Sequence, residues 1–239
     1  PEALAQAGRP VRTLDLDPKE LDGLPDDFKR TRPPAANGKV TLTTNNTDYQ
    51  PFMTYATSQT ARAAMWKLYR QRGHPKNVLV LKRMLEARQE LATALGFPTW
   101  ADYITGDKMI GTRQSTGDFI ERIVAAADKR MKADYAAVLA RRQRDVPGAT
   151  FVDAWDSSFY QEKVKAEQYN FDSQSVRPYF EYSRVKAGVM DITSRMFGIT
   201  YRAVTDATVW HADVETYDVY DGSTLLGRIY LDMFPRDNK

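Results

Sequence analysis

Apolar residues recur at three- and four-residue steps along most of the middle of the chain, which is the spacing of one helix face. Gly96 and Gly198 each follow such a run and suit the left-handed position that ends a helix. Thr99 and Asp102 resemble a capping box at the start of a short helix. The pattern therefore predicts six helices, at residues 51–72, 78–95, from Thr99, 116–144, 157–168 and 177–197.

Alternating apolar and polar residues predict strands in two other places. Lys39–Thr44 is alternating and β-branched, and the same period returns after Gly198 in residues 199–202, 214–219 and 226–234. Asp221–Ser223 suits the turn between the last two strands. We therefore expect a mainly α, α+β fold, in which a multi-helix scaffold carries a small antiparallel sheet near the C-terminus.

The positions of proline and glycine, which interrupt the hydrophobic patterns, suggest three domains. Residues 1–45 are rich in proline and polar side chains, and we expect an N-terminal arm with one short strand. Residues 46–198 form the predicted helical domain, and residues 199–239 form the predicted sheet. The long stripes of residues 78–95 and 116–144 are expected to face other apolar surfaces.

Composition narrows the class of protein. Of the 239 residues, 42% are hydrophobic and 27% are charged, which is typical of a globular chain with a core. No apolar run approaches the roughly 18 residues of a membrane span, and no signal peptide is visible, so we expect a cytoplasmic protein without a membrane partner. The chain begins with Pro1, which suggests that the native N-terminus is missing.

The charge balance gives little support to a nucleic-acid partner. The net charge is only +3, from 34 basic and 31 acidic residues. The basic run Arg141–Arg144 closes the longest predicted helix, and we interpret it as a solvated helix face. A nucleic-acid-binding domain would rest on that run and on the pI of about 9.0 alone.

Few residues offer catalytic or metal-binding chemistry. The chain has no cysteine and two histidines, His74 and His211, and it contains no H-E-x-x-H motif. A metal site or a Ser–His pair would need distant residues to converge on one of them. Asp153 and Asp156 precede a predicted helix, where we expect them to cap it. By residue chemistry alone we expect no catalytic, cofactor-binding or metal-binding residue.

Three stretches carry motifs that occur together, and in this order, in one known family. The first holds Leu85–Ala92, Leu95–Phe97 and Lys108–Met109; the second holds Trp155–Asp156, Phe159–Tyr160 and Pro178–Phe180; the third holds Trp210–Val214 and Gly227–Lys239. The third is the most specific, with the form W-x-x-D-V followed by G-x-x-Y-L-D-x-x-x-R-x-x-K. Together they resemble the zinc oligopeptidases of the thimet oligopeptidase, neurolysin and oligopeptidase A family.

The resemblance implies a zinc metallopeptidase that hydrolyses short peptides within a channel. In that family an H-E-x-x-H helix and a downstream glutamate hold the zinc, and these lie beyond the matched stretches. We therefore expect the N-terminal and central part of such an enzyme, without zinc of its own and inactive alone. The helices would form one wall of the channel. Tyr230, Asp232 and Arg236 would lie at the edge of the substrate channel, where a strand could bind an extended peptide.

Two expectations remain beside this one. The chain could be a non-catalytic helical interaction module that is derived from the same scaffold. Helices that lack their packing partner would also leave an apolar face uncovered, and the chain would then self-associate. The resemblance leaves open the cleavage preference and the choice between endopeptidase and exopeptidase action.

Overall fold

The computed structural model describes residues 10–236, which divide into two compact units between Asn170 and Phe171. The first unit contains β1 (Thr13–Leu16), η1 (Pro18–Leu21), α2 (Asp26–Arg30), β2 (Val40–Thr43), α3 (Asn46–Tyr55), α4 (Gln59–Arg70), α5 (Lys76–Ala94), α6 (Trp100–Thr105), α7 (Arg113–Asp145) and α8 (Ser157–Tyr169). The second unit contains η2 (Ser173–Phe180), α9 (Tyr182–Phe197), β3 (Ile199–Ala203), β4 (Glu215–Asp221) and β5 (Thr224–Leu231). The predicted fold class, mainly helical with a small antiparallel sheet near the C-terminus, is confirmed.

The core of the first unit begins much earlier in the chain than expected. β1 and β2 form an antiparallel pair, in which Leu14 lies opposite Leu42. Leu16, Leu21 and Phe28 are buried together with residues of α3 and α4. The described part of this proline-rich segment therefore contributes to the core of the first unit. Its apolar residues fall in turns and short elements, so they follow no single period that the sequence pattern could reveal. The domain boundaries after residues 45 and 198 stay predictions.

The predicted helix at residues 51–72 is two helices, and this correction has a local cause. Ser58 accepts a hydrogen bond from the Ala61 amide and so caps α4. The Ala56 backbone is extended at the end of α3. The apolar face continues across the break, which is why the sequence pattern does not show it.

The predicted helix at residues 177–197 also begins later than expected. Pro178 lies in the 3-10 helix η2, and α9 starts after Glu181, whose carboxylate accepts hydrogen bonds from the Ser183 and Arg184 amides. The other helices, α5 to α8, lie within three residues of their predicted limits. Thr99 caps α6 by accepting from the Asp102 amide, and Gly96 and Gly198 have the left-handed backbone expected of them.

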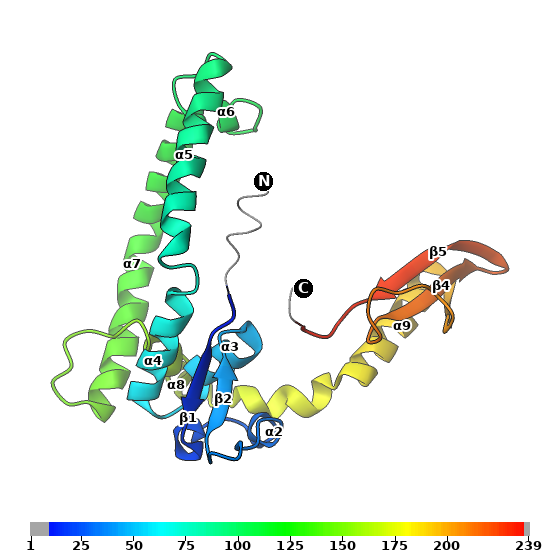
Figure 1. Cartoon of the computed structure of the whole chain (residues 1–239), viewed down its shortest axis with the longest axis horizontal. Helices are drawn as coiled ribbons and strands as arrows, with labels where there is room; N and C mark the ends of the chain where they lie inside the picture. The colour runs from blue at the N-terminus through cyan, green and yellow to red at the C-terminus, as the bar shows by residue number, and fades with distance from the viewer. Residues whose placement is uncertain (1–9, 237–239) are drawn as a thin grey trace. The chain divides into compact units, whose positions relative to one another are not determined.

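The two longest helices are α5 and α7 (Figure 1). Both expose the apolar stripes that the sequence predicts. Large exposed apolar residues include Val78, Leu81, Leu85, Leu91 and Leu95 on α5, and Phe119, Ile123, Met131 and Tyr135 on α7. Each of these side chains is 46–59% exposed. No helix of residues 10–236 has both the length and the apolar character needed to cross a membrane.

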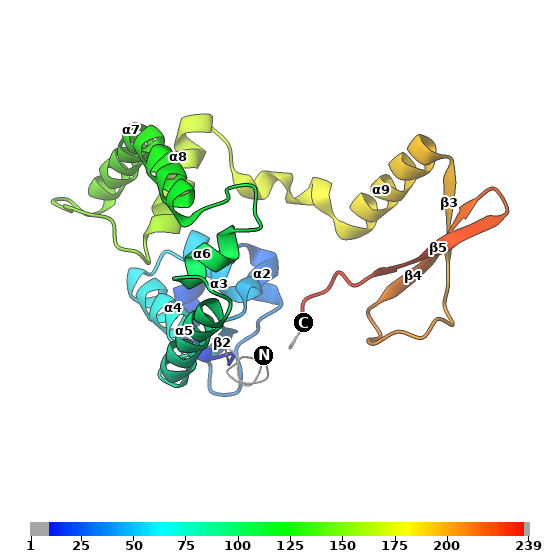
Figure 2. The same ribbon diagram turned by 90° about the horizontal axis from the view of Figure 1, so that it is seen from above.

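The second unit is a three-stranded sheet with α9 beside it (Figure 2). The strand order is β3-β4-β5, and both pairings are antiparallel. Glu215 of β4 accepts hydrogen bonds from Tyr182 and Lys186 of α9, so α9 covers the sheet face that carries Glu215. The opposite face carries Thr216, Asp218 and, on β5, Arg228 and Tyr230.

Candidate functional site

All three residues predicted for the channel edge lie together at the end of β5, and Trp210 joins them. The Asp232 carboxylate accepts two hydrogen bonds from Arg236, at 2.6 Å each, and one from the Trp210 indole Nε1, at 2.9 Å. The rings of Trp210 and Tyr230 are in contact, with their centroids 5.4 Å apart. We call Trp210, Tyr230, Asp232 and Arg236 the β5 cluster.

The end of β5 and one loop place the members of the β5 cluster. Tyr230 lies in β5 and Asp232 follows its last residue, and both side chains contact Trp210. Trp210 comes from the loop between β3 and β4, where the His211 Nδ1 and carbonyl accept from the amides of Asp213 and Val214. Val214 is buried and anchors the loop. The W-x-x-D-V motif already marked Trp210, but the sequence does not reveal its partner 22 residues later.

The backbone of Tyr230 points away from the rest of the sheet. The Thr216 carbonyl accepts a hydrogen bond of 2.9 Å from the Val204 amide, so the backbone groups of Thr216 face β3. Tyr230 lies directly opposite Thr216, and such a pair in an antiparallel ladder exchanges no hydrogen bonds. Its N–H and C=O therefore lie at the outer edge of β5. No strand of the described residues pairs with that edge.

The charges around the edge are paired. The Asp218 carboxylate accepts from Arg228 at 2.6 and 3.1 Å, and this bond raises the pKa of Arg228. The Asp232 carboxylate likewise raises the pKa of Arg236 by its hydrogen bonds. On the other face, hydrogen bonds from Lys186 and then Tyr217 lower the pKa of Glu215. The edge thus presents backbone groups and aromatic rings, while its ionic side chains already have partners.

The residues present do not fit a zinc site. Among residues 10–236, no three or more His, Asp or Glu side chains come together in a way that could hold a metal ion. His211 bonds to its own loop, and it lies 3.5 Å from the Asp213 carboxylate. Zinc in proteins takes three or four such ligands, so neither histidine belongs to a complete set.

Asp153 and Asp156 do not cap α8, which corrects the expectation from the sequence. The Asp156 side chain makes no capping bond and instead binds Arg62 and Gln59 of α4. Asp153 binds Arg142 of α7. Their role is structural, as expected. They connect α8 to the helices α4 and α7, and they do not cap its N-terminus.

The basic run at the end of α7 is likewise not a solvated face. Arg142 is buried and donates to the Phe151 carbonyl, while Arg141 binds Asp145 and Glu167. Two of these arginines therefore hold α7 against the segment that contains α8. They were misjudged because their acidic partners lie up to 26 residues away in the sequence.

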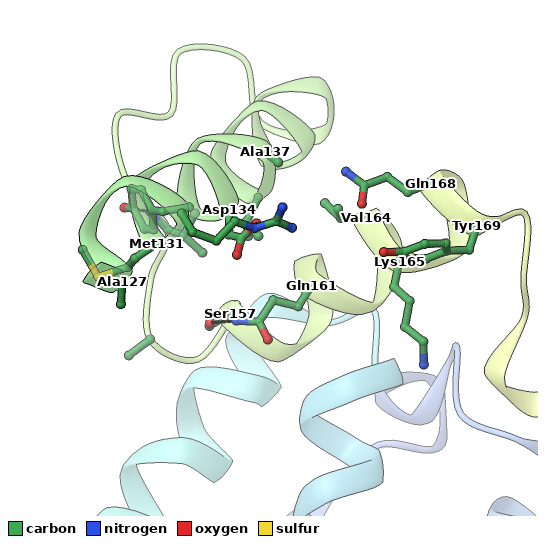
Figure 3. A pocket seen from close by; sticks show the side chains of 15 residues that line it. Ala127, Met131, Asp134, Ala137, Ser157, Gln161, Val164, Lys165, Gln168 and Tyr169 are labelled. Atoms are coloured by element: carbon green, nitrogen blue, oxygen red, sulfur yellow. Dashed lines mark hydrogen bonds and ion pairs between the residues drawn. The ribbon is translucent and has the colours of Figure 1, made fainter. Parts of the chain in front are cut away.

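A groove of about 900 Å³ lies between α7 and α8 (Figure 3). Ala127, Met131 and Ala137 line one side, and Val164 and Tyr169 lie on the other. Its acidic member Asp134 is paired with Arg130. The lining mixes apolar side chains with polar and charged ones, and its one carboxylate is already paired, so the groove offers no arrangement for acid–base chemistry.

Comparison with known proteins places the sequence among peptidases. Residues 52–239 match the model of peptidase family M3. The chain is 30% identical to oligopeptidase A of Escherichia coli (strain K12) over 95% of its own length and 35% of that protein. It is 33% identical to dipeptidyl carboxypeptidase of the same organism, over 67% of this chain and 24% of that protein. It is 32% identical to mitochondrial intermediate peptidase 1 of Cryptococcus neoformans var. neoformans, over 92% of this chain and 30% of that protein. The chain thus spans about a third or less of the length of these relatives, and it belongs to peptidase family M3.

Proposed function

We propose that this chain is part of a zinc-dependent oligopeptidase and that the outer edge of β5 binds the peptide substrate in extended form. One observation carries the proposal: the N–H and C=O of Tyr230 point away from β4, next to the β5 cluster. An unpaired strand edge binds an extended peptide by main-chain hydrogen bonds, whatever the peptide's sequence. The names of the relatives, which are all peptidases, support a peptide as the ligand.

In this proposal the chain binds and orients the substrate and does not cleave it alone. The 239 residues contain no H-E-x-x-H motif, so a zinc site would be completed by sequence outside them. Zinc, when bound there, would supply a nucleophilic water and polarise the scissile carbonyl. The helices of the first unit would form one wall of the peptide channel. Cytoplasmic localisation stays a prediction, since one relative is named as a mitochondrial peptidase.

Replacing Tyr230 with proline in the complete protein tests the binding edge. Proline removes the outward N–H but no hydrogen bond to β4, so it is tolerated at an edge position. We expect kcat/KM for a short peptide to fall about three- to ten-fold relative to Tyr230→Ala, which corresponds to one lost hydrogen bond. Tyr230→Ala is the matched control, because it removes the ring and keeps the N–H.

Two outcomes would contradict the binding edge. Equal kcat/KM values for Tyr230→Pro and Tyr230→Ala would show that no substrate bond depends on this N–H. A proline variant that unfolds, while the alanine variant stays folded, would show that another part of the complete protein already bonds to the edge. Thermal unfolding of both variants separates these cases.

The second candidate is an interaction module without catalysis. The exposed apolar stripes on α5 and α7 favour it, since large exposed apolar surfaces mark sites of association. Peptide hydrolysis by the complete protein would exclude this candidate.

A further inference from the structure

We propose that the rings of Trp210 and Tyr230 form the wall of a subsite that selects one apolar or aromatic side chain of the bound peptide. This inference rests on the proposed binding of an extended peptide at the outer edge of β5. It adds the residues that determine specificity and the class of side chain that they accept.

The two rings are exposed, yet they are held in place. The exposed fractions of Trp210 and Tyr230 are 61% and 40%. Trp210 is fixed through its Nε1 by Asp232, and Asp232 is fixed in turn by two hydrogen bonds from Arg236. The contact with the Tyr230 ring further restricts rotation of the Trp210 side chain. Rigid exposed aromatic rings bury much apolar area at little cost in conformational entropy, and such residues dominate binding at protein interfaces.

The register of the strand edge places a substrate side chain against these rings. The backbone groups of Tyr230 face outward, so an extended peptide that bonds to them has one residue directly opposite Tyr230. In a sheet, opposite residues project their side chains to the same face, about 5 Å apart at Cβ. That face carries the rings of Trp210 and Tyr230, whereas the two neighbouring substrate residues project to the face beside α9. The rings therefore lie nearest to a single substrate position, the one opposite Tyr230.

The charges at this position favour an uncharged side chain. Arg228 is bonded to Asp218 and Arg236 to Asp232, so both arginines near the rings have counter-ions, and the exposed carboxylate of Asp213 acts on Arg236 as well. A charged substrate side chain would lose hydration against the rings without gaining an unpaired partner. An apolar or aromatic side chain would bury its surface there and would gain the ring contact.

Trp210→Ala in the complete protein tests the subsite. The substrates are short peptides that differ at one position, with phenylalanine, leucine, lysine or alanine there, and the varied position is scanned along the peptide. We expect a preference for phenylalanine and leucine at one position, which Trp210→Ala lowers about three- to ten-fold while the alanine peptide changes less than about two-fold. Tyr179→Ala is the control, because Tyr179 is an exposed aromatic residue of the same unit that lies outside the β5 cluster.

A second variant and two contrary results keep the test decisive. Trp210→Phe retains a ring without the bond to Asp232, so it should keep the preference at the same position even if Trp210→Ala does not fold. An unchanged preference at every position in a folded Trp210→Ala protein would overturn the subsite. If Tyr230→Pro still lowers kcat/KM in that case, the edge binds peptide without this selection. If neither substitution has an effect, the binding edge itself fails.

Discussion

At the residue scale, Arg62 is the side chain whose position is least expected from its chemistry. It lies on the inward face of α4 and is only 1% exposed, as is Asp156 at the start of α8. The Asp156 carboxylate accepts from Arg62 at 2.6 and 3.2 Å and from Gln59 at 2.9 Å. The guanidinium also donates to the Ala56 carbonyl at the break between α3 and α4. A buried ion pair of this kind requires all its polar atoms to be bonded.

Breaking this pair should be strongly destabilising. We expect Arg62→Met to lower the free energy of unfolding by about 3–5 kcal/mol, because the Asp156 carboxylate stays buried without its main partner. Arg142 lies 3.6 Å from the same carboxylate and would still partly compensate its charge. We therefore expect a loss near 3 kcal/mol, the lower end of this range. Urea denaturation measures it, with Lys67→Met on the exposed side of α4 as the control, expected within about 0.5 kcal/mol of the parent.

The reverse change sharpens the test of this pair. The double variant Arg62→Met/Asp156→Leu removes both charges, so it should recover most of the lost stability. A single Arg62→Met variant as stable as the parent would show that the pair contributes little.

At the scale of elements, the sequence predicts what depends on local spacing. The helices α5, α6, α7 and α8 and the strands β3, β4 and β5 follow from periodicity and from glycine positions. The break before Ser58 was missed, because one serine within an unbroken apolar face gives no distinctive signal. β1 alternates strictly in Thr13–Leu16, but four residues are too few for the alternation to stand out from chance.

The candidate site was predictable only in part for a similar reason. Tyr230, Asp232 and Arg236 lie within seven residues and share a motif, so the sequence names them together. Trp210 bonds to Asp232 only because β3, β4 and β5 fold beside one another. Asp153, Asp156 and the arginines of α7 were misjudged since their partners are chosen by helix packing, which local patterns do not encode.

The apolar stripe on α5 gives a prediction at this scale. Leu81 and Leu85 are 51% and 55% exposed, and lie one turn apart on one helix face. We expect the purified 239-residue chain to self-associate through such faces, and Leu81→Lys/Leu85→Lys to lower the mass measured by sedimentation velocity at equal concentration. Lys82→Gln on the same helix is the control and should leave the mass unchanged. A parent chain that is monomeric at every concentration would rule out this association.

At the scale of the whole molecule, the zinc chemistry of the family is not matched by the residues that this chain contains. The chain matches about a third of the length of oligopeptidase A and has no H-E-x-x-H motif. The part of the chain that the structure describes brings no three potential ligands together. Under the proposed function, this chain would contribute peptide binding and scaffolding, and the zinc ligands would come from other parts of the complete protein.

If this chain binds peptide while the zinc ligands lie elsewhere in the complete protein, the purified chain should be inactive. With added zinc, the 239 residues should cleave a short fluorogenic peptide no faster than buffer does, because residues 10–236 bring together no three His, Asp or Glu side chains that could hold the metal and its water. The complete protein, measured in the same assay, should cleave it and should lose activity when a chelator removes the zinc. Chelator-sensitive cleavage by the purified chain would contradict the proposal that the zinc ligands lie elsewhere in the complete protein.

The ion pair between Arg62 and Asp156 also constrains the order in which the protein can be made and folded. The two residues are 94 positions apart, and at about 5–20 residues per second the ribosome needs roughly 5–20 seconds to add them. Throughout that interval α4 carries a cation on the face that must be buried. The core of the first unit can close around a paired Arg62 only after Asp156, at the start of α8, has left the ribosome. If that face closed earlier, it would bury the Arg62 charge without Asp156.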